Sequence, residues 1–355
     1  MKIHNFSAGP GILPAQVLQE AAQGVLNYDN TGLSLIEMSH RGPEFVDVME
    51  QAVALVRELL NLSDEYEVVF LQGGASLQFY MAPLNLLSST GYAAYLDTGT
   101  WAANAIHEAK RVGRVEVLGS SKDKNYSYLP DFSVPSDADY LHYTSNNTIF
   151  GTQFQSIPES PVPLVCDMSS DIFSKPIDAS RFSMIYAGAQ KNMGPAGTTL
   201  VIVKKDLLGK TGRNLPTMLD YQVHIDKESM FNTPPVFPIF VSMLTLKWLK
   251  NNGGLPWIGE LNRQKSTCFY QALDSNPLFK GTVEKSVRSS MNATFLLNDI
   301  RLEPAFEAML NERGFSGLKG HRSVGGYRAS MYNALPLESV QELVQTMHDF
   351  AQKHA

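Results

Sequence analysis

Apolar and polar positions follow two different periods along the first two thirds of the chain. In the segment 43–62 the apolar residues recur every three or four positions, and Pro43 stands where the first turn of a helix accepts proline. This segment is therefore predicted to form an amphipathic helix. Helices are also expected over 73–87, which a glycine turn opens, and over 101–113.

Short apolar runs of the length typical of buried strands lie between and after these helices. The predicted strands are EVVFLQ (67–72), AAYLDTG (93–99), VEVLG (115–119), DYLHYTSN (139–146), VPLVCDMSS (162–170), FSMIYAG (182–188) and TTLVIV (198–203). Apolar strands joined by helices indicate an α/β fold with a mostly parallel sheet, covered on both faces. Ligands of such sheets lie at the carboxyl ends of the strands.

The pattern changes at about residue 262, which indicates a second, smaller α/β domain. We expect a large domain over 16–261, a small domain over 262–355, and an N-terminal segment, 1–15, packed against the small domain. The elements expected in the small domain are two antiparallel strands over 281–289 and 292–297, a helix over 303–314, and a final helix over 337–355.

Composition narrows the class of protein. With 44% hydrophobic and 18% charged residues, the 355-residue chain can bury a full core, and disorder is excluded. The net charge of −6 argues against binding to nucleic acid or to anionic membranes. Two cysteines without metal-ligand spacing indicate no disulfide framework and no metal site, which suits the cytoplasm. Neither a signal peptide nor an apolar run of the ~18 residues that span a membrane is expected.

One lysine stands out in the stretch AGAQKNMGPAGTTLVIV (187–203), where small residues and glycines surround Lys191 between two predicted strands. An amine held there would lose part of its hydration, which lowers its pKa and makes it a nucleophile able to form a Schiff base. The ordinary alternative is a lysine that lies over the loop with its ammonium in water.

Three other features fall at predicted strand ends. Gly73 and Gly74 open a helix, so their backbone N–H groups could hold an anion, although a tight turn is the better explanation of the two glycines taken alone. Trp101 could stack on a ligand or belong to the core. Asp167 ends a buried strand, where a carboxylate needs a partner such as a cation, a protonated ring nitrogen, a helix N-terminus or an arginine. Asp171 is a rival for the same role.

These features together are the parts that a pyridoxal phosphate site needs: a phosphate cup, a ring platform, a partner for the pyridinium nitrogen and a Schiff-base lysine. Nine segments also resemble the phosphoserine aminotransferase family, in its order and nearly from end to end. They are NFSAGPGILP, EMSHRG, QGGASLQF, GTWAANA, SNNTIFGTQF, DMSSDIFSKPID, YAGAQKNMGPAG, FNTPP and GHRSVGGYRASMYNA.

The resemblance implies the fold type I of pyridoxal-phosphate-dependent transferases, which is that of aspartate aminotransferase, and class V of the aminotransferases. It implies a homodimer with active sites at the subunit interface. The implied reaction is amino transfer between L-glutamate and 3-phosphohydroxypyruvate, which gives 2-oxoglutarate and phosphoserine. The family often also accepts a phosphorylated hydroxythreonine in pyridoxine biosynthesis.

The resemblance also assigns roles to residues of this chain. Lys191 would be the Schiff-base lysine and Asp167 the partner of the pyridinium nitrogen. Around the cofactor, Trp101 would stack on the pyridine ring, Thr148 would lie at the polar edge of that ring, and the cofactor phosphate would be held by Gly74, Ala75, Ser76 and Gln190, with Asn232 and Thr233 reaching it from the other subunit. Around the substrate, Arg328 would clamp the α-carboxylate, and the distal phosphate or carboxylate would meet His40, Arg41, His321 and Arg322.

One position departs from part of the family, which carries an arginine where this chain has Ser76. The glycine turn then has one cation fewer, so more of the phosphate binding would fall to Arg41, His321 and Arg322. The alternatives are an alanine–glyoxylate type aminotransferase, a cysteine desulfurase, or a binding protein that has lost catalysis. A desulfurase needs a mobile cysteine, whereas Cys166 and Cys268 are expected in a strand and a helix.

Overall fold

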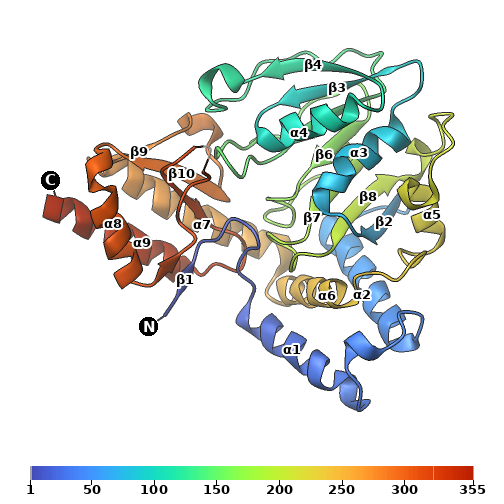
Figure 1. Ribbon diagram of the computed structural model, residues 1–355, viewed down its shortest axis with the longest axis horizontal. Coiled ribbons are helices and arrows are strands. Elements are labelled where there is room, and N and C mark those ends of the chain that lie inside the picture. The colour runs from blue at the N-terminus through green and yellow to red at the C-terminus, as the bar shows by residue number, and fades with distance from the viewer. Residues whose placement is uncertain (1, 323, 355) are drawn as a thin grey trace.

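The computed structural model describes residues 2–322 and 324–354. A seven-stranded sheet forms the larger part of the molecule, with the strand order β2-β8-β7-β6-β5-β3-β4 (Figure 1). Strand β8 runs antiparallel to both of its neighbours, and the other pairings are parallel. The strands are β2 (Tyr66–Leu71), β3 (Tyr92–Asp97), β4 (Arg114–Ser120), β5 (Tyr140–Thr144), β6 (Leu164–Asp167), β7 (Met184–Gly188) and β8 (Thr199–Lys204). The predicted mostly parallel sheet is confirmed.

Helices cover both faces of this sheet, as its apolar strands require. Val68 and Phe70 of β2 face a core shared with α1 (Ala15–Leu26), α2 (Pro43–Leu60) and α6 (Val236–Asn251). The alternate residues Val69 and Leu71 face a second core with α3 (Gly74–Leu86), α4 (Thr100–Ala109) and α5 (Tyr221–Asp226). Because both faces are buried, the strands other than the partly exposed edge strand β4 carry nearly continuous apolar runs. Pro43 is the first residue of α2, as its position in the sequence predicts.

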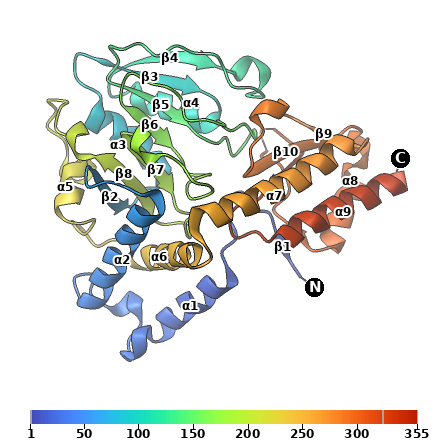
Figure 2. The same ribbon diagram turned by 180° about the vertical axis from the view of Figure 1, so that it is seen from behind.

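A third core lies in the C-terminal part of the chain, on the left of Figure 1. The antiparallel sheet β12-β10-β9 packs there with three helices. The elements are α7 (Gly254–Ser275), β9 (Phe279–Gly281), β10 (Asn292–Leu297), α8 (Glu303–Glu312), β11 (Phe315–Ser316), β12 (Tyr327–Ser330) and α9 (Leu337–His354). Phe6 belongs to this core, and β1 (His4–Asn5) pairs with β11. Figure 2 shows α7 running from beside α6 to the small sheet, so the expected boundary at 262 falls inside one helix.

The first strand predicted for this region, over 281–289, is wrong. The strand is β9, which ends at Gly281, and Lys285–Val287 form a 3-10 turn. The backbone of this segment bonds elsewhere: Gln153 N–H donates to the carbonyl of Val287, and Ser289 N–H donates to the carbonyl of Gly151, at 2.8 Å each. Lys285 and Arg288 also form ion pairs with Asp274 of α7, at 2.8 and 2.7 Å. These contacts hold the segment against residues 151–153 and α7 instead of in the sheet.

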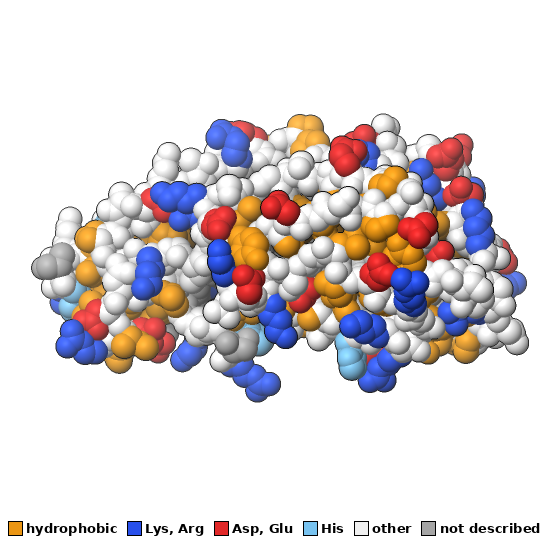
Figure 3. Space-filling model, turned by 90° about the horizontal axis from the view of Figure 1, so that it is seen from above, with side chains coloured by type: hydrophobic (Ala, Val, Ile, Leu, Met, Phe, Trp, Pro, Cys, Tyr) orange, Lys and Arg blue, Asp and Glu red, His pale blue; other side chains and the backbone are white. Residues whose placement is uncertain are grey.

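The surface carries charges of both signs. On the face seen in Figure 3, basic and acidic side chains are interspersed with apolar ones. Within the described residues, no helix combines the length and the apolarity that crossing a bilayer would require.

Candidate active site

A cavity of about 330 Å³ opens at the carboxyl ends of β5, β6 and β7. This is the edge of the sheet at which ligands of α/β proteins bind. The structure brings ten of the predicted site residues to its wall: Gly74, Ala75, Ser76, Trp101, Thr148, Asp167, Gln190, Lys191, His321 and Arg328.

Lys191 lies in the turn that follows β7, with its amine inside the cavity. Its Nζ donates a hydrogen bond of 2.7 Å to the hydroxyl of Thr148. Burial lowers the pKa of Lys191 to about 8; the charge of Asp167 opposes this shift and that of Arg328 adds to it. The structure therefore favours the desolvated amine over a lysine that extends into water. Near neutral pH, a larger fraction of such an amine than of an ordinary lysine is in the neutral form that acts as nucleophile and base.

Asp167 is the last residue of β6, and its side chain is buried at the base of the cavity. One carboxylate oxygen, Oδ1, accepts hydrogen bonds from the backbone N–H and the hydroxyl of Ser169, at 3.0 and 2.6 Å. Burial raises the pKa of Asp167, while the Ser169 bonds and the charge of Lys191 act in the opposite direction. The carboxylate is thus held in place at the cavity wall, where it can pair with a bound cationic group.

Asp171, the rival of Asp167, has other partners. Its carboxylate accepts a hydrogen bond from the hydroxyl of Ser145 and another of 3.0 Å from Gln153 Nε2. The residue is buried and does not line the cavity. Only Asp167 of the two is therefore placed to meet a ligand.

The glycine turn supplies a site for an anion. Gly73 and Gly74 have φ angles of +90° and +65°, which only glycine adopts readily, and they lead directly into α3. The N–H groups of the first helical turn have no partner within the helix, and the helix dipole adds positive potential there. The hydroxyl of Ser76 and the side chain of Gln190 lie at the same cavity.

Trp101 and Arg328 line the remaining wall and carry unpartnered nitrogens. Trp101 Nε1 and Arg328 Nε are buried without a hydrogen-bond partner among the described residues. Arg328 also donates a hydrogen bond of 3.0 Å from its terminal nitrogen to the carbonyl of Thr148. Buried donors without partners are costly, so they are expected where a ligand completes the bonding.

Five predicted residues lie outside this cavity: His40, Arg41, Arg322, Asn232 and Thr233. The side chain of Asn232 donates to Gln72 at the end of β2, and Gln72 donates in turn to the carbonyl of Thr233. Arg41 and Arg322 are exposed. The roles predicted for these five residues stay predictions.

Several wall residues were missed by the sequence analysis, among them Ala8, Gly9, Asn146 and Ser169. Ser169 had a usable signal, because a serine two positions after an aspartate commonly bonds its carboxylate in a turn. The N-terminal residues had none, because only the folded chain brings them to Lys191.

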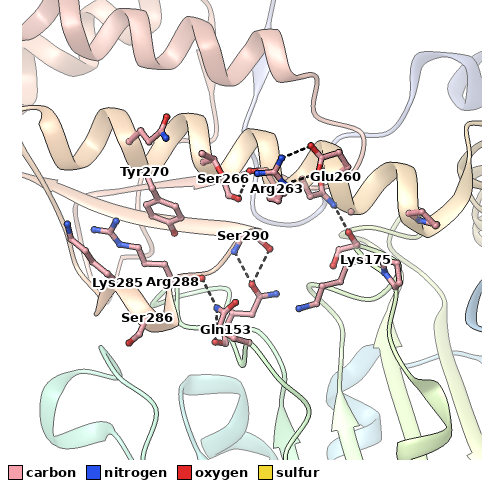
Figure 4. A pocket seen from close by; sticks show the side chains of 18 of the residues that line it. Gln153, Lys175, Glu260, Arg263, Ser266, Tyr270, Lys285, Ser286, Arg288 and Ser290 are labelled. Atoms are coloured by element: carbon pink, nitrogen blue, oxygen red, sulfur yellow. Dashed lines mark hydrogen bonds and ion pairs between the residues drawn. The ribbon is translucent and has the colours of Figure 1, made fainter.

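A larger cavity, of about 840 Å³, lies between α7 and the segments 153–155 and 285–290 (Figure 4). Its charged groups are mostly paired with one another, Arg288 with Asp274 and Arg263 with Glu260, at 2.7 Å each. Gln153 accepts two hydrogen bonds from Ser290. Arg288 Nε is a buried donor without a partner here too, but this cavity has no lysine whose pKa burial lowers, as it does for Lys191, and no glycine turn at a helix N-terminus facing a buried carboxylate. We therefore place the chemistry in the smaller cavity.

Comparison with known proteins identifies the family of the chain. The model of the aminotransferase class-V family matches residues 3–343, and the chain belongs to this family. More particularly, it is 60% identical over 355 residues to a phosphoserine aminotransferase of Flavobacterium psychrophilum, with 99% of this chain and 100% of the relative covered. The family resemblance seen in the sequence is confirmed.

Solved structures of phosphoserine aminotransferases have the same fold. The enzyme from Bacillus circulans subsp. alkalophilus superposes with a TM-score of 0.96 at 45% identity, over 100% of this chain and 99% of that one. A PLP-bound phosphoserine aminotransferase from Trichomonas vaginalis gives a TM-score of 0.93 at 38% identity, over 98% and 100% of the two chains. The predicted fold of an α/β aminotransferase is therefore confirmed.

Proposed function

We propose that this chain has phosphoserine aminotransferase activity: the reversible, pyridoxal-phosphate-dependent transfer of an amino group between L-glutamate and 3-phosphohydroxypyruvate, giving 2-oxoglutarate and O-phospho-L-serine. The observation that carries the proposal is the buried Lys191 amine, in one cavity with the Asp167 carboxylate and a helix N-terminus. Identity to phosphoserine aminotransferases along the whole chain supports the substrate class over that of alanine–glyoxylate enzymes.

The residues of the cavity fit the cofactor. The N-terminus of α3, with Ser76 and Gln190, would hold a phosphate, and the ring of Trp101 would lie against an aromatic ring. Asp167 would pair with the ring nitrogen and keep its proton. The pyridoxal group, when bound, supplies the sink for the electrons released at the substrate Cα.

Lys191 performs the proton transfers in this proposal. Its Nζ would bond to the cofactor before the substrate amine replaces it, and would then take the proton from the substrate Cα. A pKa of about 8 suits both roles, since the neutral amine is accessible near neutral pH. Thr148 accepts a hydrogen bond from Nζ and so holds the amine in the cavity.

Arg328 would bind the α-carboxylate that every substrate carries. Its guanidinium lies at the same cavity as Lys191, and its anchoring bond to the carbonyl of Thr148 leaves other donors for a ligand. Arginine binds carboxylates by paired N–H bonds, and it would thereby fix the Cα–H bond relative to Lys191.

We also propose a homodimer in the cytoplasm. The family resemblance supports it, because it implies that Asn232 and Thr233 reach the cofactor of the other subunit, and neither residue lines the cavity of its own chain. A location in a reducing compartment agrees with the two free cysteines, Cys166 and Cys268. Cys166 is buried in β6 and Cys268 lies in α7, so neither supports desulfurase chemistry.

Mixing two inactive variants tests the shared site. Lys191→Ala homodimers, and homodimers that carry Asn232→Ala with Thr233→Ala, should each have little activity, whereas their heterodimer contains one site with all native residues. After subunits exchange at equal amounts, about a quarter of the parental activity should return. Activity is measured after mixing, with the mass of the assembly. No recovery in a confirmed heterodimer would remove Asn232 and Thr233 from the partner's site.

Two arginine variants test the substrate class. Arg328→Ala should impair glutamate and phosphoserine alike, because both carry an α-carboxylate. Arg322→Ala should weaken phosphoserine about ten- to hundredfold and glutamate much less, since a charge-assisted contact is worth roughly 1.5–3 kcal/mol. The measurement is kcat/KM for both substrates, with the exposed Arg301→Ala as control. Equal losses for both substrates in Arg322→Ala would refute its phosphate role.

A further inference from the structure

Lys265 is a buried cation with no part in the proposed chemistry. It lies in the middle of α7 with 0% of its surface exposed. Its Nζ donates to the carbonyls of Met331, Tyr332 and Leu335, at 3.1, 2.8 and 3.2 Å. An ammonium has three N–H donors, so these contacts use all of them.

The charge of Lys265 is costly where it lies. Burial lowers its pKa to about 7, and no acidic side chain among the described residues offsets this shift. The three carbonyl dipoles favour the protonated form, which alone can donate three bonds. A buried cation without an anion is rare, because desolvation is expensive. The three hydrogen bonds from this cation therefore give residues 331–335 a defined position relative to α7.

The held segment is bonded to the turn that carries Lys191. The backbone N–H of Asn333 donates a bond of 3.0 Å to the side-chain oxygen of Asn192, the residue after Lys191. The amide nitrogen of Asn192 donates in turn to the carbonyl of Ser170, at 3.3 Å, beside the Asp167 turn. Asn333 is fixed further by Asn262 of α7, at 2.9 Å.

A second connection runs through Tyr332. Its hydroxyl donates a bond of 2.7 Å to the carbonyl of Ala8, which lines the cavity. Its ring lies so close to Gly11 that an added Cβ there would come within 2.8 Å of it and 2.9 Å of the Lys191 carbonyl. Gly11 also donates to the carbonyl of Gln190, at 2.7 Å. The same segment follows β12, the strand that carries Arg328.

We propose that Lys265 is a positioning residue for the transamination proposed above: by holding residues 331–335, its ammonium sets the Lys191 turn relative to Arg328. The inference rests on the proposed function, because it concerns the distance between the amine that moves the proton and the arginine that holds the substrate. A misplacement of about 1 Å between such groups can cost on the order of a hundredfold in rate.

The test uses the cofactor-loaded enzyme with Lys265→Met, which keeps the length of the side chain and removes all three donors. The matched control is Lys247→Met, at an exposed lysine of α6. We expect kcat/KM per loaded site to fall roughly ten- to hundredfold for glutamate and phosphoserine alike. The pH titration of the cofactor's visible absorbance should also shift, since it reports the surroundings of the Lys191 amine.

A purely stabilising role of Lys265 would lower the melting temperature and leave both readouts at the parental values in the folded protein. That result would overturn the proposal. If Lys265→Met does not fold, Asn192→Ala is used instead, because it breaks the same connection at its other end. An Asn192→Ala enzyme with the absorbance titration and the kcat/KM of the parent would also overturn the proposal. Where both variants fold, their combined effect should be smaller than the product of the single effects, because both act through one connection.

Failure of the proposed function is recognised separately. A parent enzyme that shows the visible absorbance but no activity on phosphoserine would refute the substrate assignment. The absorbance titration of Lys265→Met would still decide whether Lys265 positions the amine.

Discussion

Replacing Lys191 by alanine is expected to lower kcat for amino transfer by at least about 10⁴-fold. General acid–base catalysis alone contributes roughly 10²–10⁴-fold, and this residue would also form the covalent bond to the cofactor. The amine lies inside the cavity and is bonded to Thr148, so water is a poor substitute for it. The measurement is the rate of 2-oxoglutarate formation from glutamate at saturating cofactor.

The fold should survive this change, because the amine contributes one hydrogen bond and no packing to the three cores. Circular dichroism should match the parent, and Lys210→Ala, at an exposed lysine, should behave as the parent in every assay. Turnover near the parental value in the Lys191 variant would refute the assignment of the catalytic lysine.

The second large effect is expected for Asp167→Asn, with kcat lower by about 10²–10³-fold and the cofactor still bound. An amide carries no charge to hold the proton of the ring nitrogen, and the loss of one preorganised electrostatic partner typically has an effect of this size. The hydrogen bonds from Ser169 can still be accepted by the amide oxygen, so the local turn should persist.

Asp171→Asn is the matched control for this prediction. It replaces a buried carboxylate four residues away, whose partners Ser145 and Gln153 lie away from the cavity. Its main effect should be on stability, measured by thermal unfolding. A severe loss of kcat in Asp171→Asn together with parental kcat in Asp167→Asn would show that the wrong aspartate was chosen.

The sequence predicted the parts of the site that depend on local order along the chain. Lys191 was visible because a lone amine among small residues follows an apolar strand, and Asp167 because it ends one. The choice between Asp167 and Asp171 could not be made locally, since it depends on hydrogen bonds from Ser145 and Gln153, which are distant in the sequence.

Long-range contacts also explain the rest of what the sequence left open. The segment 281–289, expected as a strand, bonds through its backbone to residues 151–153 and through two ion pairs to Asp274 on α7. The apolar spacing of α7 gave no sign that Lys265 would be buried and bonded to three carbonyls. Such contacts form only when separate segments of the chain pack together, and no periodicity along the chain encodes them.

The most direct test of the central claim is to identify the residue that carries the cofactor. Borohydride reduction of the purified yellow enzyme makes the bond between cofactor and lysine permanent, and peptide mass spectrometry then locates it. The account predicts that the added mass lies on Lys191 and is absent from the Lys191→Ala variant. Modification of another lysine, such as Lys175 or Lys265, with Lys191 unmodified would contradict it.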